Sequence, residues 1–370
     1  MNAALCHRSA GETGRAPPRA GAAGLRYSSE AGGGTSGTGE NYRNRPAWLK
    51  CGSHLTNLLG SGTTLAMWST CLHTVSYAGV WPGQVRLSLE ECLVRAKRLG
   101  FNGVMLVAKR PHLSVLDFDE AAAERLQART QELGLSVACL AAYTDFTIGA
   151  ERADIPVREM QLLYLTRLGR LAQILKCPAL RVFTAYQRDA VSPESSWNTC
   201  VESLKEASRR IAEYGVSLAV QNHHDTAVHY ESFAELLDEV NEPNCRAAFD
   251  AWSPALHGSN LVNAVRCLGK RIAHTTVADY VRRPRFRYVP TLVNYAPETD
   301  AIRAVPMGEG FIDYSVFFTA LKEVGYQGSV AYEMCSPLRG GGSEANLDRC
   351  AKRFLEWMGK HGHGKASGGM

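Results

Sequence analysis

The chain lacks paired cysteines and long apolar runs. Its 11 cysteines are spread singly from Cys6 to Cys350, with no C-x-x-C pair and no zinc-binding spacing. Single cysteines of this kind are typical of free thiols in a reducing compartment, so we expect a cytoplasmic protein. No stretch of 18 apolar residues occurs, and the sequence therefore predicts no membrane span.

The chain also lacks a strong excess of charge where it is expected to fold. Of the formal net charge of +5, four units belong to residues 1–50, which carry seven basic and three acidic side chains. The remainder is nearly neutral. Charge therefore gives no reason to expect nucleic acid or an anionic membrane as a partner.

The first 60 residues differ in composition from the rest of the chain. The stretch "SSEAGGGTSGTGEN" is rich in Gly, Ser and Thr, and it cannot bury enough apolar surface to offset the entropy of ordering. We therefore predict a disordered extension over residues 1–60. A transit peptide is the alternative, although no amphipathic period or signal-peptide apolar region is visible. At the other end, residues 361–370 predict a flexible tail.

From about residue 64 the chain repeats one pattern of helix, glycine and strand. Ser88 and Glu91 form a capping box, and apolar residues then recur at helical spacing as far as Gly100. The apolar run "FNGVMLV" follows. The same order recurs around Gly134, Gly215 and Gly325, each just past an amphipathic helix, where a left-handed cap is favourable.

The repeated unit predicts an α/β fold with eight strands. Further strand candidates are "CPALRVFTAY" (177–186), "CRAAFDAW" (245–252), "RIAHTTVADY" (271–280) and "TTLAMWST" (63–70). Strands that are apolar on both faces are typical of buried parallel sheets. Eight β/α units predict a (β/α)8 TIM barrel over residues 64–360. A doubly wound sheet is the alternative, but no Gly-rich phosphate loop follows the first strand.

Polar residues stand at the ends of the later predicted strands, where a barrel places its chemistry. Four successive strands each provide one oxygen or nitrogen donor: Gln221, Asp250, His274 and Glu333. Two carboxylates, an imidazole and an amide oxygen suit one divalent ion such as Mn²⁺, Mg²⁺, Co²⁺ or Zn²⁺. Taken singly, each residue has a structural explanation, such as a helix cap or a buried core histidine.

These motifs resemble the xylose isomerase-like TIM barrel superfamily, in its sugar phosphate isomerase/epimerase branch. The resemblance spans about residues 64–358. It rests on "LGFNGVML", on "GVSLAVQNHH" and above all on "VPMGEGFIDYSVFFTALKEVGYQGSVAYEM" (305–334). It implies a small carbohydrate substrate and a metal site of Glu, Asp, His and Glu on strands 5 to 8. Endonuclease IV, a distant relative, needs further histidines that this chain lacks.

The sequence departs from the family's metal site at two positions. Gln221 stands where the strand-5 Glu is expected. In strand 7 the usual ligand position holds Thr276, and His274 precedes it by two residues. Residues two apart share a strand face, so we expect His274 to reach the ion instead.

The resemblance implies proton abstraction next to a sugar carbonyl, through an enediolate. Gln221 cannot accept a proton at neutral pH, which leaves Glu333 as the expected base. His223 is the expected acid or second base, with His224 as its alternative. We predict a metal-dependent isomerase or epimerase of a keto-sugar or sugar phosphate. A lyase or dehydratase, similar to inosose dehydratase, and a non-catalytic sugar-binding barrel are the alternatives.

Other residues near the predicted barrel mouth are candidates for substrate binding. Trp252 could stack on a sugar face, and His224 and Lys109 lie in loops that follow strands. Arg282 lies in a predicted loop, "YVRRPRFRYVP", at a position where related epimerases carry a substrate-contacting arginine. That cluster could bind a phosphate or sugar acid, or equally form a solvated lid or a subunit contact in a homo-oligomer.

Overall fold

The computed structural model describes residues 68–152, 154–335 and 337–363. The predicted extension (1–60) lies outside the described residues, as do residues 364–370 of the predicted tail. His363 is buried, and its carbonyl accepts a hydrogen bond from Trp68 N at 3.0 Å. In the part of the chain that the structure describes, no helix is long and apolar enough to cross a membrane.

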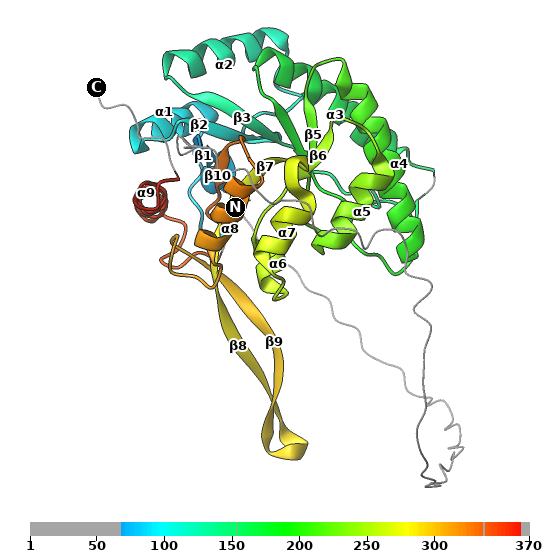
Figure 1. Cartoon of the computed structure of the whole chain (residues 1–370), viewed down its shortest axis with the longest axis vertical. Coiled ribbons are helices and arrows are strands. Elements are labelled where there is room, and N and C mark those ends of the chain that lie inside the picture. The colour runs from blue at the N-terminus through cyan, green and yellow to red at the C-terminus, as the bar shows by residue number, and fades with distance from the viewer. Residues whose placement is uncertain (1–67, 153, 336, 364–370) are drawn as a thin grey trace, which may run out of the picture. The chain divides into compact units, whose positions relative to one another are not determined.

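Eight parallel strands close into a barrel, as the sequence predicts (Figure 1). Around the barrel the order is β1, β10, β7, β6, β5, β4, β3, β2, so neighbours in sequence are neighbours in space except for the inserted β8 and β9. The barrel strands are β1 (Thr70–His73), β2 (Gly103–Val107), β3 (Ser136–Ala141), β4 (Ala179–Val182), β5 (Ser217–Gln221), β6 (Cys245–Ala248), β7 (Ile272–Val277) and β10 (Val330–Tyr332).

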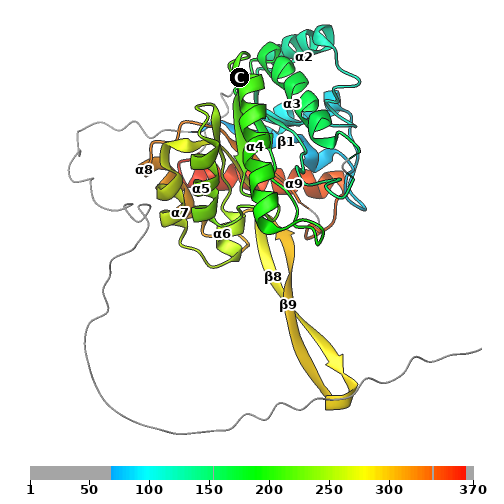
Figure 2. The ribbon, with the colours of Figure 1, turned by 90° about the vertical axis from the view of Figure 1, so that its right-hand side faces the viewer.

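Helices cover the outside of the barrel (Figures 1 and 2). The capping box of Ser88 and Glu91 is confirmed, and Gly100 ends its helix with φ +99°. The α-helices are α1 (Leu89–Leu99), α2 (Glu120–Glu132), α3 (Val157–Ile174), α4 (Pro193–Ala212), α5 (Tyr230–Val240), α6 (Trp252–Leu256), α7 (Leu261–Leu268), α8 (Tyr314–Glu323) and α9 (Glu344–Lys360). Short 3-10 helices are η1 (Thr74–Tyr77), η2 (Gly269–Arg271) and η3 (Pro290–Leu292).

The barrel interior is narrow and lined by small side chains. An inner cluster contains Cys71, Met105 and Cys139, together with alanines of β3, β4, β5, β6 and β10. The much larger outer core fills the space between strands and helices. Because the inner layer consists mainly of alanine, the barrel leaves room near its mouth for longer polar side chains.

Two strand predictions need correction. The first strand is β1, not residues 63–70, of which 63–67 lie outside the described part; only Thr70 is shared. Residues 280–289 of the predicted loop 280–290 belong instead to β8 (Asp279–Val289), which pairs antiparallel with β9 (Asn294–Val305). Figures 1 and 2 show this hairpin projecting from the barrel. Arginine and aromatic side chains alternate from Arg285 to Tyr288 of β8, and Tyr288 packs on Tyr295 of β9 with ring centroids 5.3 Å apart. This period of two is a strand signal that the density of arginine obscured.

Candidate active site

A cavity of about 840 Å³ opens at the carboxyl ends of the barrel strands. Loops and strand ends from most of the barrel contribute to it, as expected for this fold. Seven of the predicted site residues line it: Lys109, Gln221, His223, His224, Asp250, Trp252 and Glu333. The structure therefore brings these seven residues together at one cavity, and their functional roles stay predictions.

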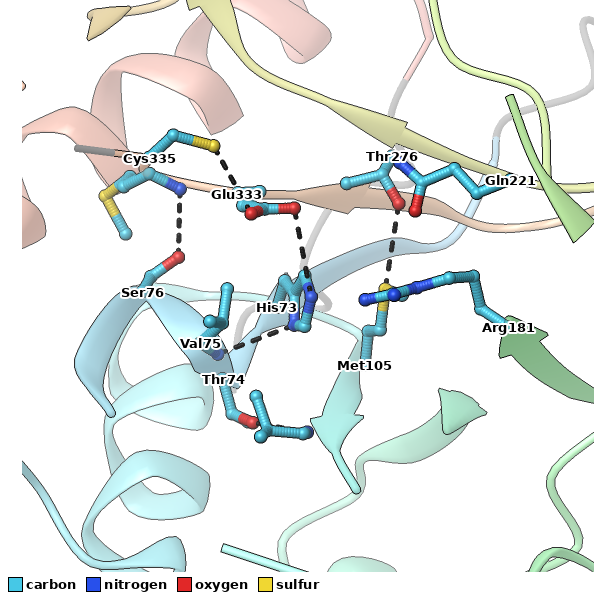
Figure 3. A network of polar contacts seen from close by, with 12 residues as sticks. His73, Thr74, Val75, Ser76, Met105, Arg181, Gln221, Thr276, Glu333 and Cys335 are labelled. Atoms are coloured by element: carbon cyan, nitrogen blue, oxygen red, sulfur yellow. Dashed lines mark hydrogen bonds and ion pairs between the residues drawn. The ribbon is translucent and has the colours of Figure 1, made fainter. Parts of the chain in front are cut away.

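Glu333 follows β10 and presents its carboxylate to the cavity (Figure 3). Its Oε1 accepts a hydrogen bond from Cys335 Sγ at 3.3 Å, and its backbone N donates to Val277 O at 2.9 Å. Burial raises the pKa of this carboxyl, while the nearby charge of Arg181 and the Cys335 bond oppose the rise. A carboxylate with a raised pKa and an open face is suited to accept a proton.

His73, at the end of β1, is a neighbour of Glu333 that the sequence reasoning missed. Its Nε2 lies 3.8 Å from Glu333 Oε2, too far for a hydrogen bond but close enough for one to form after a small movement. The Nδ1 accepts from Val75 N at 3.5 Å, which favours the tautomer with the proton on Nε2. Burial, with the charge of Arg181, lowers the pKa of His73 well below its ordinary value, so the ring is neutral.

Gln221 and Asp250 form a buried pair on neighbouring strands. Gln221 Nε2 donates to Asp250 Oδ2 at 2.7 Å, and Trp252 N donates to Asp250 Oδ1 at 3.1 Å. Burial raises the pKa of Asp250 to about 6, although the bond from Gln221 acts against the shift. Asp250 is therefore partly protonated near neutral pH. Gln221 donates from its amide nitrogen to this carboxylate and does not act as a second base.

The two histidines after β5 belong to an aromatic wall of the cavity. His224 has φ +68° and stacks on Tyr186 with centroids 3.9 Å apart, whereas His223 lies 5.4 Å from the Trp252 ring. Their Nδ1 atoms are 3.0 Å apart. Burial lowers the pKa of each to about 4, so both rings are neutral at physiological pH. This wall offers flat, uncharged surface to a sugar face.

His274 and Thr276 share a face of β7, but they do not lie at the same depth. Thr276 lines the cavity, and its hydroxyl faces Met105 Sδ at 3.7 Å. His274 is not among the cavity residues, is 1% exposed, and its Nε2 has no hydrogen-bond partner. Burial lowers its pKa to about 3. The prediction that the two side chains share one strand face is confirmed, but His274 lies one layer below the barrel mouth.

Arg282 also lies outside the cavity lining. Its Nη2 donates to Leu256 O at 2.6 Å, and the guanidinium lies 4.7 Å from the Phe311 ring centroid. Nearby Asp279 has a structural role, since Asp279 Oδ2 accepts from Gly308 N and Gly310 N, both at 2.9 Å. A substrate contact through Arg282 stays a prediction.

The donors predicted for a divalent ion do not converge into a metal site. Among the described residues, no three or more His, Cys, Asp or Glu side chains are grouped so that they could hold an ion. His274 is too deep, and Gln221 uses its amide to hold Asp250. The arrangement at this mouth therefore does not fit the metal that the family resemblance implies.

A cationic side chain that the sequence reasoning missed also reaches the mouth. Arg181 extends from β4 into the barrel, toward Thr276, Gln221 and Met105 (Figure 3). At the cavity rim, Lys109 Nζ lies 3.7 Å from the Tyr143 ring centroid. Burial and the charge of Arg181 lower the pKa of Lys109. The cavity thus combines two cations with the carboxylates of Asp250 and Glu333.

Comparisons with known proteins agree with this architecture. The family model described as "Xylose isomerase-like TIM barrel" matches residues 93–358. The L-ribulose 3-epimerase of Methylomonas sp. (strain DH-1) is 22% identical over 273 residues, which cover 71% of this chain and 83% of that protein.

Solved structures show the same fold. D-psicose 3-epimerase of Clostridium cellulolyticum H10 superposes with a TM-score of 0.62 at 16% identity, covering 80% of this chain and 99% of that one. The probable 3-DHS dehydratase AsbF of Bacillus anthracis superposes with a TM-score of 0.59 at 18% identity, covering 78% and 99%. With its closed barrel and the family model matched over most of its length, the chain belongs to the xylose isomerase-like TIM barrel family.

Proposed function

We propose that this protein is a carbohydrate isomerase or epimerase that moves a proton next to the carbonyl of a keto-sugar or sugar phosphate. The observation that carries the proposal is the carboxylate of Glu333, which faces a cavity at the barrel mouth and has a raised pKa. The similarity to L-ribulose 3-epimerase supports the same class of reaction.

Glu333 acts as the base. Its free oxygen takes the proton from the carbon next to the carbonyl, while the Cys335 thiol donates to the other oxygen and holds the carboxylate in place. The resulting acid returns the proton to the same carbon or to its neighbour, as in general acid–base catalysis. Gln221 cannot share this role, so one group performs both transfers in an isomerisation.

Asp250 is the better proton donor where a second group is required. Its pKa of about 6 leaves a useful protonated fraction at neutral pH, whereas a pKa of about 4 leaves His223 almost wholly neutral. The sequence predicted the opposite preference because it cannot show burial. His223, His224 and Trp252 then serve to bind the sugar, with Lys109 at the rim.

A dehydratase is the second candidate function. The cavity holds one carboxylate base, one partly protonated acid and, in place of a second base, Gln221. This set suits an elimination in which Glu333 removes the proton and Asp250 protonates the departing hydroxyl. The fold similarity to a dehydratase is compatible with it.

Solvent isotope exchange tests the proposal and separates the candidates. The purified protein is incubated in D2O with D-psicose, D-tagatose, L-ribulose and their phosphates, and deuterium at carbon is followed by NMR. We expect deuterium incorporation with a product isomeric to the substrate. Loss of water from the sugar would favour the dehydratase, and binding of sugars without exchange would favour the non-catalytic barrel. A cytoplasmic location and a homo-oligomer stay predictions.

The pH dependence of exchange should reflect the environment of Glu333. Because burial raises its pKa, exchange should rise with pH through an inflection above the ordinary glutamate value of about 4.3. The Cys335 bond acts in the opposite direction, so Cys335→Ala should move this inflection further up. Rate–pH profiles of both proteins check this. An inflection at or below the ordinary value, or a downward shift in Cys335→Ala, would contradict the assignment.

A further inference from the structure

Arg181 is a charged residue inside the barrel. In β4 it follows Ala179 by two residues and therefore shares the inner face, and its register partners are the inner residues Ala141 and Ala219. The small side chains around it provide the space that a guanidinium needs. Arg181 is 2% exposed, yet it lines the cavity.

The guanidinium has no direct carboxylate partner among the described residues, although it contacts the Tyr143 side chain and interacts with the charge of Glu333. Its Nη1 donates to Ala142 O at 2.9 Å, but Nε has no hydrogen-bond partner, and no carboxylate in the described ranges pairs with it within 4.0 Å. Its carbon lies 4.0 Å from the Phe183 ring centroid and 5.1 Å from that of Tyr143. Burying an unpaired charge costs on the order of several kcal/mol. Stability therefore does not explain this arginine.

The positive charge acts across the whole mouth. In addition to the effect of burial, it lowers the pKa of His73 on β1 and of His274 on β7. It also opposes the rise in the pKa of Glu333 after β10. These groups belong to three different parts of the barrel, and Figure 3 shows Arg181 extending from β4 toward the side on which His73 and Glu333 lie.

We propose that Arg181 is the electrophilic catalytic residue of this site. It binds the substrate's carbonyl oxygen and stabilises the enediolate, a role that the family resemblance assigns to a metal ion. This rests on the proposed function. Arginine suits the task because it stays charged and presents several donors in one plane. Preorganised donors aimed at a developing oxyanion provide a large share of catalysis in many enzymes.

The proton-transfer step balances without another reactant. Glu333 takes the proton from carbon, the C–H electron pair forms a carbon–carbon double bond, and the carbonyl pair moves to oxygen. Arg181 donates hydrogen bonds to that oxyanion. Return of the proton from Glu333 to the same carbon gives exchange. Return of the proton to the former carbonyl carbon, with the proton of the neighbouring hydroxyl passing to the former carbonyl oxygen, gives the isomer.

The same guanidinium disfavours a divalent ion at this mouth. Like charges repel strongly where water is scarce, and a metal held by Asp250 and Glu333 would share its site with a fixed cation. Removing Arg181 should therefore improve metal binding while it removes catalysis. These opposite effects distinguish a catalytic arginine from one that only supports the fold.

The first test compares exchange by EDTA-treated wild-type protein, Arg181→Met and Arg181→Lys. Arg246→Met is the control, because Arg246 is a strand arginine at the start of β6 whose Nη2 donates to Lys270 O at 2.7 Å, away from the cavity residues. We expect EDTA to leave wild-type and control exchange unchanged, Arg181→Met to lose about 10²–10³-fold in kcat, and Arg181→Lys to lie between them. Dependence of wild-type exchange on added Mn²⁺, or full activity in Arg181→Met, would overturn the proposal.

The second test measures Mn²⁺ binding by electron paramagnetic resonance and does not require a substrate. We expect Arg181→Met to bind Mn²⁺ at least about tenfold more tightly than the wild type, with Arg181→Lys close to the wild type. Equal or tighter binding by the wild type would overturn the assignment of Arg181. If the wild type exchanges no sugar, the proposed function fails, and the Mn²⁺ comparison still decides whether Arg181 is the cation of this mouth. If Arg181→Met does not fold, Arg181→Gln replaces it in both tests.

Discussion

Glu333→Gln should reduce deuterium exchange into a keto-sugar substrate by about 10²–10⁴-fold, the range typical of a lost general base. The amide has nearly the same shape as the carboxylate, but it cannot accept the proton at neutral pH. Sugar binding should change much less, because the aromatic wall and the rim lysine are untouched. The loss should therefore appear in kcat more than in KM.

The same substitution should not weaken the fold. Burial disfavours the ionised form of Glu333, and a neutral amide avoids that desolvation. We expect the thermal midpoint of Glu333→Gln to equal or exceed that of the wild type. Glu323→Gln is the matched control, since Glu323 is an exposed residue paired with Arg266 at 2.8 Å on the outer surface. Full exchange by Glu333→Gln, or a similar loss in Glu323→Gln, would remove Glu333 from the mechanism.

The barrel was predictable because its signals are local and repeated. Four units join an amphipathic helix to an apolar run through a glycine with positive φ (Gly100, Gly134, Gly215 and Gly325), and eight β/α units in all allow few other arrangements. The hairpin was not predictable in the same way. Its strands are largely exposed away from the barrel and β8 is rich in arginine, so the apolar pattern that marks buried strands is absent there.

The sequence allowed most of the candidate residues to be placed at one end of the barrel, but not at their depths or with their neighbours. Because alternate residues share a strand face, the sequence correctly placed His274 and Thr276 on one face. The two residues are also separated by about 6.6 Å along the strand, so His274 lies deeper. His73 was missed because the first strand was placed too early. Arg181 was missed although its signal is present, since a charged residue two positions after Ala179 must point inward if Ala179 does.

Burial decides what these residues can do, and a sequence does not report it. Asp250 and His223 both titrate away from their ordinary ranges because they are desolvated, the carboxyl upward and the imidazole downward. In the proposed mechanism Asp250, predicted from the sequence as a metal ligand, therefore donates the proton, and His223, the expected acid, binds the sugar. The predicted metal site is not supported among the described residues, since donors that share the barrel mouth need not converge on one point.

Gly310→Ala should destabilise the protein by about 3 kcal/mol or more, in the range of overpacking combined with the loss of a buried carboxylate's partners. A Cβ at Gly310 would lie 2.5 Å from Tyr280 O and closer still to the Asp279 carboxylate. Asp279 is 1% exposed and is held by backbone donors from Gly308, Gly310 and Tyr280. The "GEG" motif is therefore a cradle for a buried carboxylate.

The effect should extend from stability to the cavity. Asp279 begins β8 directly after β7, and its neighbours Ala278 and Tyr280 line the cavity, so a displaced Asp279 moves the part of the wall where Tyr280 stacks on Trp252. Gly359→Ala is the matched control, because Gly359 lies in α9 with no atom within 4 Å of an added Cβ. There the change should stabilise by about 0.5–1 kcal/mol. Urea unfolding of the two variants checks both signs, and a loss below about 1 kcal/mol in Gly310→Ala would show that the cradle can relax around a methyl group.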